Sequence, residues 1–343
     1  MWLNRKRLRK SGVLYPGGAN SAHFLASLDL RDAAFHHPAE QVAGAWPRLV
    51  EEINAWSGSA VVSHETFART PRKKIPAAVK SFTGSDVRVV LTVRDLGRQL
   101  PAVWQERLKN RDHQTYSEFL RSVMATAPFV GSSAPADAEE PFWTPQDVAA
   151  LAARWAKVVG PESVIVVTVP PSGADRQELW RRFSQAVELP AIDFALDNGR
   201  RNESLGTAET ELLRRLNARL PEDFAWLSYR NQIKRKLVKE TLSARRAHGG
   251  LAVPRECAGP ISKIASATID ALDRGGYRVV GNLEDLRPNP APADVAMPDD
   301  LSEGQLLEVA LDVVRDLSTS SPAPVSRISE RQRRWIRRAR LEH

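Results

Sequence analysis

The chain has 343 residues, a formal net charge of +8, and hydrophobic and charged fractions of 42% and 26%, which argue for a folded globular protein and against extensive disorder. Its single cysteine, Cys257, excludes an intramolecular disulfide and a cysteine-based zinc site, and no stretch reaches the roughly eighteen apolar residues of a membrane span. We therefore expect a cytoplasmic protein without a transmembrane segment, whose positive charge permits an anionic ligand without identifying one.

The chain begins directly on a helical pattern. Trp2, Leu3 and Leu8 have the spacing of one helical face, and Gly12 supplies a stop. Within the sequence, no strand or turn comes before this helix, which is an unusual start for a globular fold.

Three short runs rich in Val and Ile predict strands at residues 59–63, 87–94 and 163–169, and a fourth, residues 277–281, predicts an edge strand. Nearly continuous hydrophobicity of this kind is typical of strands buried on both faces of a parallel sheet. Helical patterns alternate with the runs and follow them, at residues 38–56, 75–82, 96–109, 116–124, 145–158, 207–220, 229–246, 261–273 and 301–317. This alternation predicts an α/β fold with an open parallel sheet and a helical C-terminal region.

Composition divides the chain into parts. Residues 131–140 are small and acidic and predict a loop, and the proline-rich stretch 287–298 predicts a linker. We expect an α/β domain over residues 1–290, a linker and helix over residues 291–322, and a basic tail over residues 323–343.

The basic tail has seven arginines around Trp335, between Arg327 and Arg340. Such a segment could bind nucleic acid or contact an anionic membrane surface peripherally. Because the sequence holds no recognisable nucleic-acid-binding motif, we expect a solvated appendage and no specific nucleic-acid partner.

Candidate catalytic residues follow the first predicted strand, since ligands of open α/β sheets bind beyond the carboxyl ends of the strands. His64 and Glu65 lie there, and either could take a proton from an acceptor hydroxyl, with Glu65 slightly preferred. The alternative is structural: Ser63 caps a short helix at residues 65–68, and Glu65 is an acid of its first turn.

Arg94 follows the second predicted strand and leads directly into a predicted helix. There it could hold a phosphate lying over the helix N-terminus, or it could pair with Asp95 and merely fix the turn. His36 and His37 are adjacent and lack the spacing of a metal-binding face, so we expect solvated loop residues and no metal site. The sequence contains neither Gly-x-x-x-x-Gly-Lys-(Ser/Thr) nor Gly-x-Gly-x-x-Gly.

The chain resembles the sulfotransferase family, in its divergent actinobacterial form. The resemblance covers most of the chain to about residue 290 and lies in "NRKRLRKSGVLYPG", "VVSHETFA", "VRVVLTVRDLGRQLPAVWQERLKNR", "RNESLGTAETELLRRLNARL" and "VVGNLEDLRP". It implies a P-loop NTPase-like parallel sheet flanked by helices. It also implies transfer of a sulfuryl group from 3′-phosphoadenosine 5′-phosphosulfate (PAPS), without a metal, to a hydroxyl of a carbohydrate, lipid or small metabolite.

In that family the first strand leads into a Pro-Lys-(Ser/Thr)-Gly-(Ser/Thr)-(Ser/Thr) loop that wraps the phosphosulfate group, and a helix follows. Met1 matches a position inside this helix, so we expect the first strand and the loop to be missing. Because such a loop stabilises charge in the transition state, we expect the chain beginning at Met1 to be inactive in sulfuryl transfer. The alternatives are a non-catalytic truncated remnant and a basic protein that binds nucleic acid or an anionic surface.

The resemblance also suggests individual residues. Arg94 matches the arginine that contacts the 3′-phosphate of the donor, but the usual serine eight residues later is replaced by Ala102. Glu65, with His64 as second choice, lies where the family places its base.

Later in the chain, Asn202 and Ser204, with Arg200 or Arg201 nearby, could supply further phosphate contacts by the same resemblance. The alternative for them is a loop and an N-cap for the helix predicted at residues 207–220.

Overall fold

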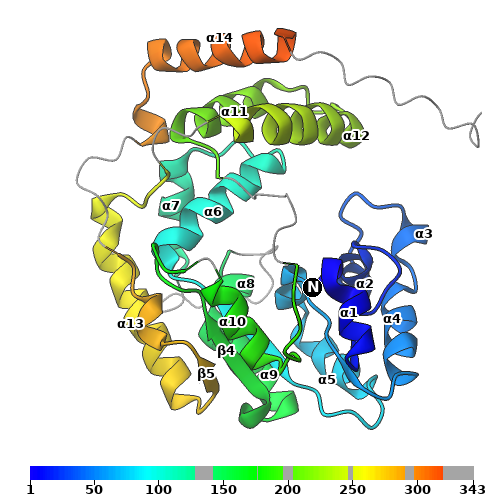
Figure 1. Cartoon of the computed structure of the whole chain (residues 1–343). Helices are drawn as coiled ribbons and strands as arrows, with labels where there is room; N and C mark the ends of the chain where they lie inside the picture. The colour runs from blue at the N-terminus through cyan, green and yellow to red at the C-terminus, as the bar shows by residue number, and fades with distance from the viewer. Residues whose placement is uncertain (128–141, 176, 196–203, 246–249, 290–296, 320–343) are drawn as a thin grey trace, which may run out of the picture.

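The computed structural model describes the chain except for residues 128–141, 176, 196–203, 246–249, 290–296 and 320–343. The described part is a mostly helical α/β protein with two small parallel sheets (Figure 1), which confirms the predicted class in outline. In these residues no helix combines the length and the apolar character that crossing a bilayer requires. The predicted loop at residues 131–140 and the basic tail from residue 323 lie outside the described part.

The first 82 residues form an N-terminal lobe around a short parallel strand pair (blue in Figure 1). The predicted helix at residues 38–56 is broken in two, because Gly44 adopts a left-handed φ of 72°. One helix of this lobe, α2, was not predicted from the sequence. The elements are η1 (Trp2–Asn4), α1 (Arg5–Lys10), β1 (Val13–Leu14), α2 (Ala22–Leu30), α3 (Ala39–Val42), α4 (Ala45–Asn54), β2 (Ser59–Ala60), η2 (Glu65–Arg69), η3 (Arg72–Lys74) and α5 (Ile75–Lys80).

The second sheet has three parallel strands in the order β3-β4-β5, with Val89 opposite Val164 and Ile165 opposite Arg278. This confirms the predicted strands, including the edge position of the last one. Helices α9 and α13 cover one face of the sheet and α10, which was not predicted, covers the other. The elements are β3 (Val89–Val93), α8 (Trp143–Gln146), α9 (Val148–Val159), η4 (Pro161–Ser163), β4 (Val164–Thr168), α10 (Glu178–Ala186), α13 (Ala258–Arg274), β5 (Arg278–Val280) and η8 (Leu283–Leu286).

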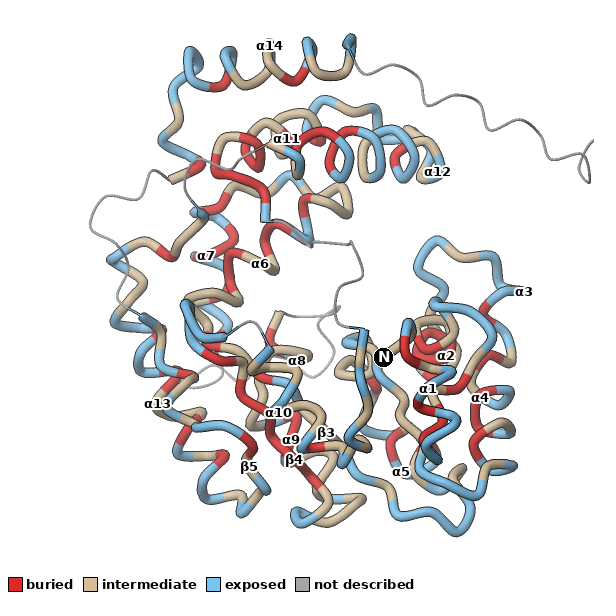
Figure 2. The backbone as a smooth tube through the Cα atoms, in the orientation of Figure 1, coloured by how far each residue is buried: buried red, intermediate tan, exposed pale blue. Residues whose placement is uncertain are grey.

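Strand β4 is buried along its whole length, as its continuous apolar sequence predicts (red in Figure 2). Successive side chains point to opposite faces. Val166 packs in the cluster that includes Leu272 of α13, whereas Ile165 packs in the cluster that includes Ala186 of α10. The strand therefore joins two apolar layers into one sheet core.

Strand β3 has a similar sequence but a different environment. Of its five residues only Val93 is buried, and Thr92 is exposed, so the expected burial on both faces is wrong for this strand. The reason is its position: β3 pairs with β4 on one side and has no strand on the other side within the described residues. Strand β2 is likewise paired only with β1 among the described residues, so β2 and β3 each have one unpaired edge.

A helical lobe completes the molecule (top of Figure 1). Its core surrounds Trp104 of α6 and Phe119 of α7, both almost fully buried. Helix α14 is held onto this lobe by Arg245, which pairs with Asp312 at 2.7 Å and Asp316 at 3.0 Å. The elements are α6 (Leu96–Lys109), α7 (Tyr116–Ala125), α11 (Thr207–Arg219), α12 (Trp226–Ser228), the π-helix η5 (Tyr229–Thr241), η6 (Leu242–Ala244), η7 (Arg255–Cys257), η9 (Pro298–Asp300) and α14 (Glu303–Thr319).

Candidate functional site

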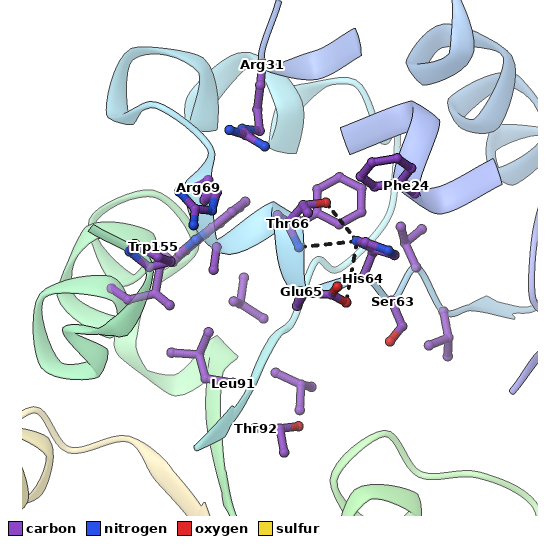
Figure 3. Close-up of a pocket in the computed structure, with 18 of the residues that line it drawn as sticks. Phe24, Arg31, Ser63, His64, Glu65, Thr66, Arg69, Leu91, Thr92 and Trp155 are labelled. Carbon is purple, nitrogen blue, oxygen red and sulfur yellow. Dashed lines mark hydrogen bonds and ion pairs between the residues drawn. The ribbon is translucent and has the colours of Figure 1, made fainter. Parts of the chain in front are cut away.

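A cleft of about 2300 Å³ is bounded by residues of the N-terminal lobe, the β3 sheet and the helical lobe. Its walls include both open-edged strands, β2 and β3, and one face of α6. His64, Glu65 and Arg94 all line it, so the tertiary structure brings the sequence-predicted residues of two strand ends to one cavity. Figure 3 shows this region, with Leu91 and Thr92 of β3 drawn among the lining residues around His64 and Glu65.

Arg94 lies where β3 leads into α6, and its Nε atom is buried without a hydrogen-bond partner. No hydrogen bond or ion pair joins its guanidinium group to any residue in the described part of the chain. Burial lowers the pKa of Arg94, and the neighbouring Arg98 adds to this effect, yet an arginine remains protonated at neutral pH. A partly buried cation without an acceptor is a binding group for an anion.

Asp95 attracts Arg94 electrostatically, which raises the Arg94 pKa, but it forms its ion pair with Arg98. Its Oδ1 accepts the backbone N–H of Arg98 at 3.0 Å and so caps α6, while its Oδ2 pairs with the Nε of Arg98. Arg98 also donates to the carbonyl of Pro170 at 2.9 Å. The alternative in which Asp95 pairs with Arg94 is therefore wrong, because the buried carboxylate is already occupied by Arg98.

His64 is the N-cap of η2: its Nδ1 accepts the backbone N–H of Thr66 at 3.3 Å and lies 2.8 Å from the Thr66 hydroxyl (Figure 3). The expected cap at Ser63 is thus wrong by one residue, although Glu65 does lie in the first turn. A backbone N–H can only donate, so Nδ1 is unprotonated and the neutral ring carries its proton on Nε2. Burial lowers the pKa of His64, partly offset by Glu65, which favours this neutral form.

Glu65 lies beside His64, and its side chain is much more exposed to solvent. Its side chain is 86% exposed, against 24% for His64, and its Oε2 is 3.6 Å from Nδ1 of the ring. A carboxylate at the cleft surface can accept a proton, whereas the neutral His64 presents an N–H donor at Nε2. The pair thus offers a proton acceptor at Glu65 and a hydrogen-bond donor at His64.

His23 ties the ends of β1 and β2 together, a role that sequence analysis missed. Its buried ring accepts the backbone N–H of Ser63 at 3.0 Å and donates from Nε2 to the carbonyl of Pro16 at 2.9 Å. Burial lowers the pKa of His23 and keeps it neutral, as these two hydrogen bonds require. Because Ser63 directly precedes His64, His23 positions the candidate site from the interior. Nothing in the local sequence distinguishes it from other helix histidines.

Of the remaining predicted phosphate contacts, Asn202 lies outside the described residues, as do Arg200 and Arg201. Ser204 is exposed and does not line the cleft, and the N-cap position of α11 is Gly206, without a side-chain cap. Ala102, which replaces the family's serine, does line the cleft but offers no hydrogen-bonding group.

His36 and His37 lie in the loop after α2, as predicted, with His36 exposed and His37 partly buried. Both line the cleft, and the ring of His36 stacks on Trp226 with the centroids 4.2 Å apart. No pattern in the sequence pointed to Trp226. Among the described residues no group of His, Cys, Asp or Glu side chains could hold a metal ion.

No family model matches the chain, and no curated protein or solved structure is significantly similar to it. The chemistry of the cleft therefore has to be argued from the residues that line it.

Proposed function

We propose that the cleft binds a 3′-phosphorylated adenine nucleotide, with the 3′-phosphate on Arg94, and that the protein belongs to a system that transfers a sulfuryl group from PAPS to a hydroxyl acceptor. The observation that carries the proposal is the guanidinium of Arg94, which has no hydrogen-bond or ion-pair partner among the described residues. It lies at the carboxyl end of a parallel strand, where α/β proteins bind ligands, and directly before the N-terminus of α6. A phosphate there meets a cation next to the start of a helix.

In the transfer, the acceptor oxygen would bond to sulfur while the bond from sulfur to the 5′-phosphate oxygen breaks, releasing adenosine 3′,5′-bisphosphate. The hydroxyl proton would pass to the carboxylate of Glu65. The Nε2–H of His64 would donate to an oxygen of the acceptor or the sulfuryl group and so orient it. Glu65 is thereby the base and His64 the donor, a division that follows from the capped Nδ1 of His64.

Sulfuryl transfer also needs a phosphosulfate loop, and the sequence from Met1 holds no lysine-bearing loop of this kind. The open edges of β2 and β3 both line the cleft. Support for the proposal comes from the residues beyond these two strands, because His64, Glu65 and Arg94 line the same cleft. We assign nucleotide binding to Arg94 and the handling of the acceptor hydroxyl to Glu65 and His64.

Isothermal titration of the chain with adenosine 3′,5′-bisphosphate tests this function. Arg94→Ala should weaken binding about 10- to 100-fold, because one charged hydrogen-bonded contact is lost. The affinity for adenosine 5′-phosphate, which lacks the 3′-phosphate, should stay unchanged. Arg88→Ala is the matched control, since Arg88 precedes β3 and is paired with Glu188 at 2.7 Å. Equal affinities of the wild type and Arg94→Ala for the bisphosphate would sink the assignment.

A further inference from the structure

We propose that a row of aromatic rings along the cleft binds the pyranose rings of a linear carbohydrate. The ring row runs from His64 through Phe24 and Phe35 to Trp226, with successive centroids 5.0, 6.2 and 6.3 Å apart. All four residues line the cleft, and Figure 3 shows Phe24 beside His64. That the row presents a hydroxyl group to Glu65 rests on the function proposed above.

The ring row is assembled from segments far apart in the sequence. Phe24 belongs to α2, Phe35 to the loop that follows it, His64 to the start of η2, and Trp226 to the start of α12. His36 stacks on Trp226 at an interplanar angle of 17°, so the loop after α2 meets the helical lobe at this point. The row therefore continues across the boundary between the two lobes and follows the cleft rather than the core of either lobe.

The backbone of this loop supports a ligand-binding role. Asp32, Phe35 and His36 all have left-handed φ values, of 56°, 39° and 57°. Such conformations are unfavourable for residues other than glycine and concentrate at ligand sites, where the surrounding structure maintains them. Despite this strain, the loop leaves the Phe35 side chain 51% exposed in the cleft instead of burying it. About half of the Phe35 surface is thus accessible to a ligand in the cleft.

The composition of the cleft around the row selects the class of ligand. Three histidines, His36, His37 and His64, lie among the rings. A hydrocarbon chain would bury polar ring nitrogens such as Nε2 of His64 without supplying a hydrogen-bond partner. Arg230 and Lys234 of η5 line the same cleft and disfavour a cationic ligand. A pyranose ring suits both features, because its C–H faces pack on aromatic rings while its hydroxyl groups bond to polar side chains at their edges.

The test is saturation-transfer difference NMR and calorimetric titration with maltohexaose, cellohexaose and chitohexaose, on the chain without nucleotide. We expect at least one of these neutral oligosaccharides to bind. Trp226→Ala and Phe35→Ala should each weaken that binding at least about tenfold, as expected for truncating an aromatic contact. Trp226→Phe, which keeps an aromatic ring at this position, should retain most of the oligosaccharide affinity. Leu227→Ala is the control, since Leu227 is 59% exposed and does not line the cleft.

Three results would overturn the inference. The first is no binding of any oligosaccharide, and the second is equal oligosaccharide affinities of Trp226→Ala and Leu227→Ala. The third is that Trp226→Ala weakens the binding of n-octanol or 2-naphthol, titrated as non-carbohydrate ligands, but not the binding of any oligosaccharide. Arg94→Ala separates this inference from the proposed function, because oligosaccharide binding should survive in it. Failure to bind the bisphosphate, with intact oligosaccharide binding, contradicts only the nucleotide assignment. Failure to bind oligosaccharides, with intact bisphosphate binding, contradicts only the ring row.

Discussion

Two neighbouring strands, β3 and β4, each have an arginine at their carboxyl end, and the two arginines have opposite surroundings. Arg182 of α10 reaches the end of β4, where it donates to the carbonyl and the hydroxyl of Thr168 at 3.0 and 2.7 Å and pairs with Asp285. Arg94 at the end of β3 has no such acceptor within the described residues. The comparison teaches that neighbouring acceptors decide whether a strand-end arginine is held in the structure, as Arg182 is, or left available, as Arg94 is among the described residues.

The same contrast extends along the strands. Every residue of β4 is buried between two helix layers, whereas most of β3 is only partly buried beside the cleft. Both strands have Val-rich sequences of the same length. The difference therefore comes from the position of each strand in the sheet, central for β4 and at the edge for β3.

The largest expected effect concerns the strand interiors. Ile165→Ala should lower the free energy of unfolding by about 3 kcal/mol, because a fully buried side chain is replaced by a cavity. Leu91→Ala on β3 should cost only about 1 kcal/mol, since its side chain is already partly open to the cleft. Urea denaturation of both variants measures the difference. Equal losses would show that β3 is as well covered as β4.

A smaller effect is expected at the strand ends. Arg182→Ala should cost about 2 kcal/mol, because Asp285 and the end of β4 lose their buried hydrogen-bond donor. Arg94→Ala should change the free energy of unfolding by less than about 0.5 kcal/mol, since no partner is left behind. The exposed neighbour Arg181 provides the control variant Arg181→Ala. A loss in Arg94→Ala comparable to that in Arg182→Ala would assign Arg94 a structural role.

The smallest effect is a pH dependence at the β4 end. Burial by itself would raise the pKa of Asp285, but hydrogen bonds from Arg182 and Thr168 outweigh it and lower the pKa below its ordinary value. An unfolded aspartate titrates near about 3.9, so the stabilisation is present above that pH and is lost as the pH falls through the lower folded value.

Urea midpoints of the wild type and Asp285→Asn measured from pH 6 to pH 2.5 test this dependence. The wild type should be more stable at pH 6, and the difference should narrow as Asp285 becomes protonated. A difference that stays constant over this range would show that the carboxylate charge of Asp285 contributes nothing.

The sequence by itself determined the elements whose signals are local. The Val-rich runs located β3, β4 and β5, and the pattern of residues 96–109 gave the limits of α6, because Asp95 caps that helix through its own backbone neighbours. It also directed attention to strand ends, since parallel strands bring these to one side of a sheet. Helices α2 and α10 were not predicted from the sequence and are seen only in the structure.

Only the tertiary structure decided which side chains of the site contact one another. Asp95 had two arginines within reach, and the carbonyl of Pro170, seventy-two residues from Arg98, fixed which one it pairs with. The meeting of Phe35 with Trp226 joins two lobes that no local pattern links. Periodicity and propensity act over a few residues, whereas the partner of a side chain depends on segments that meet only when the chain has folded. For that reason the sequence could indicate Arg94 as a candidate binding residue, but only the structure showed that it has no partner among the described residues.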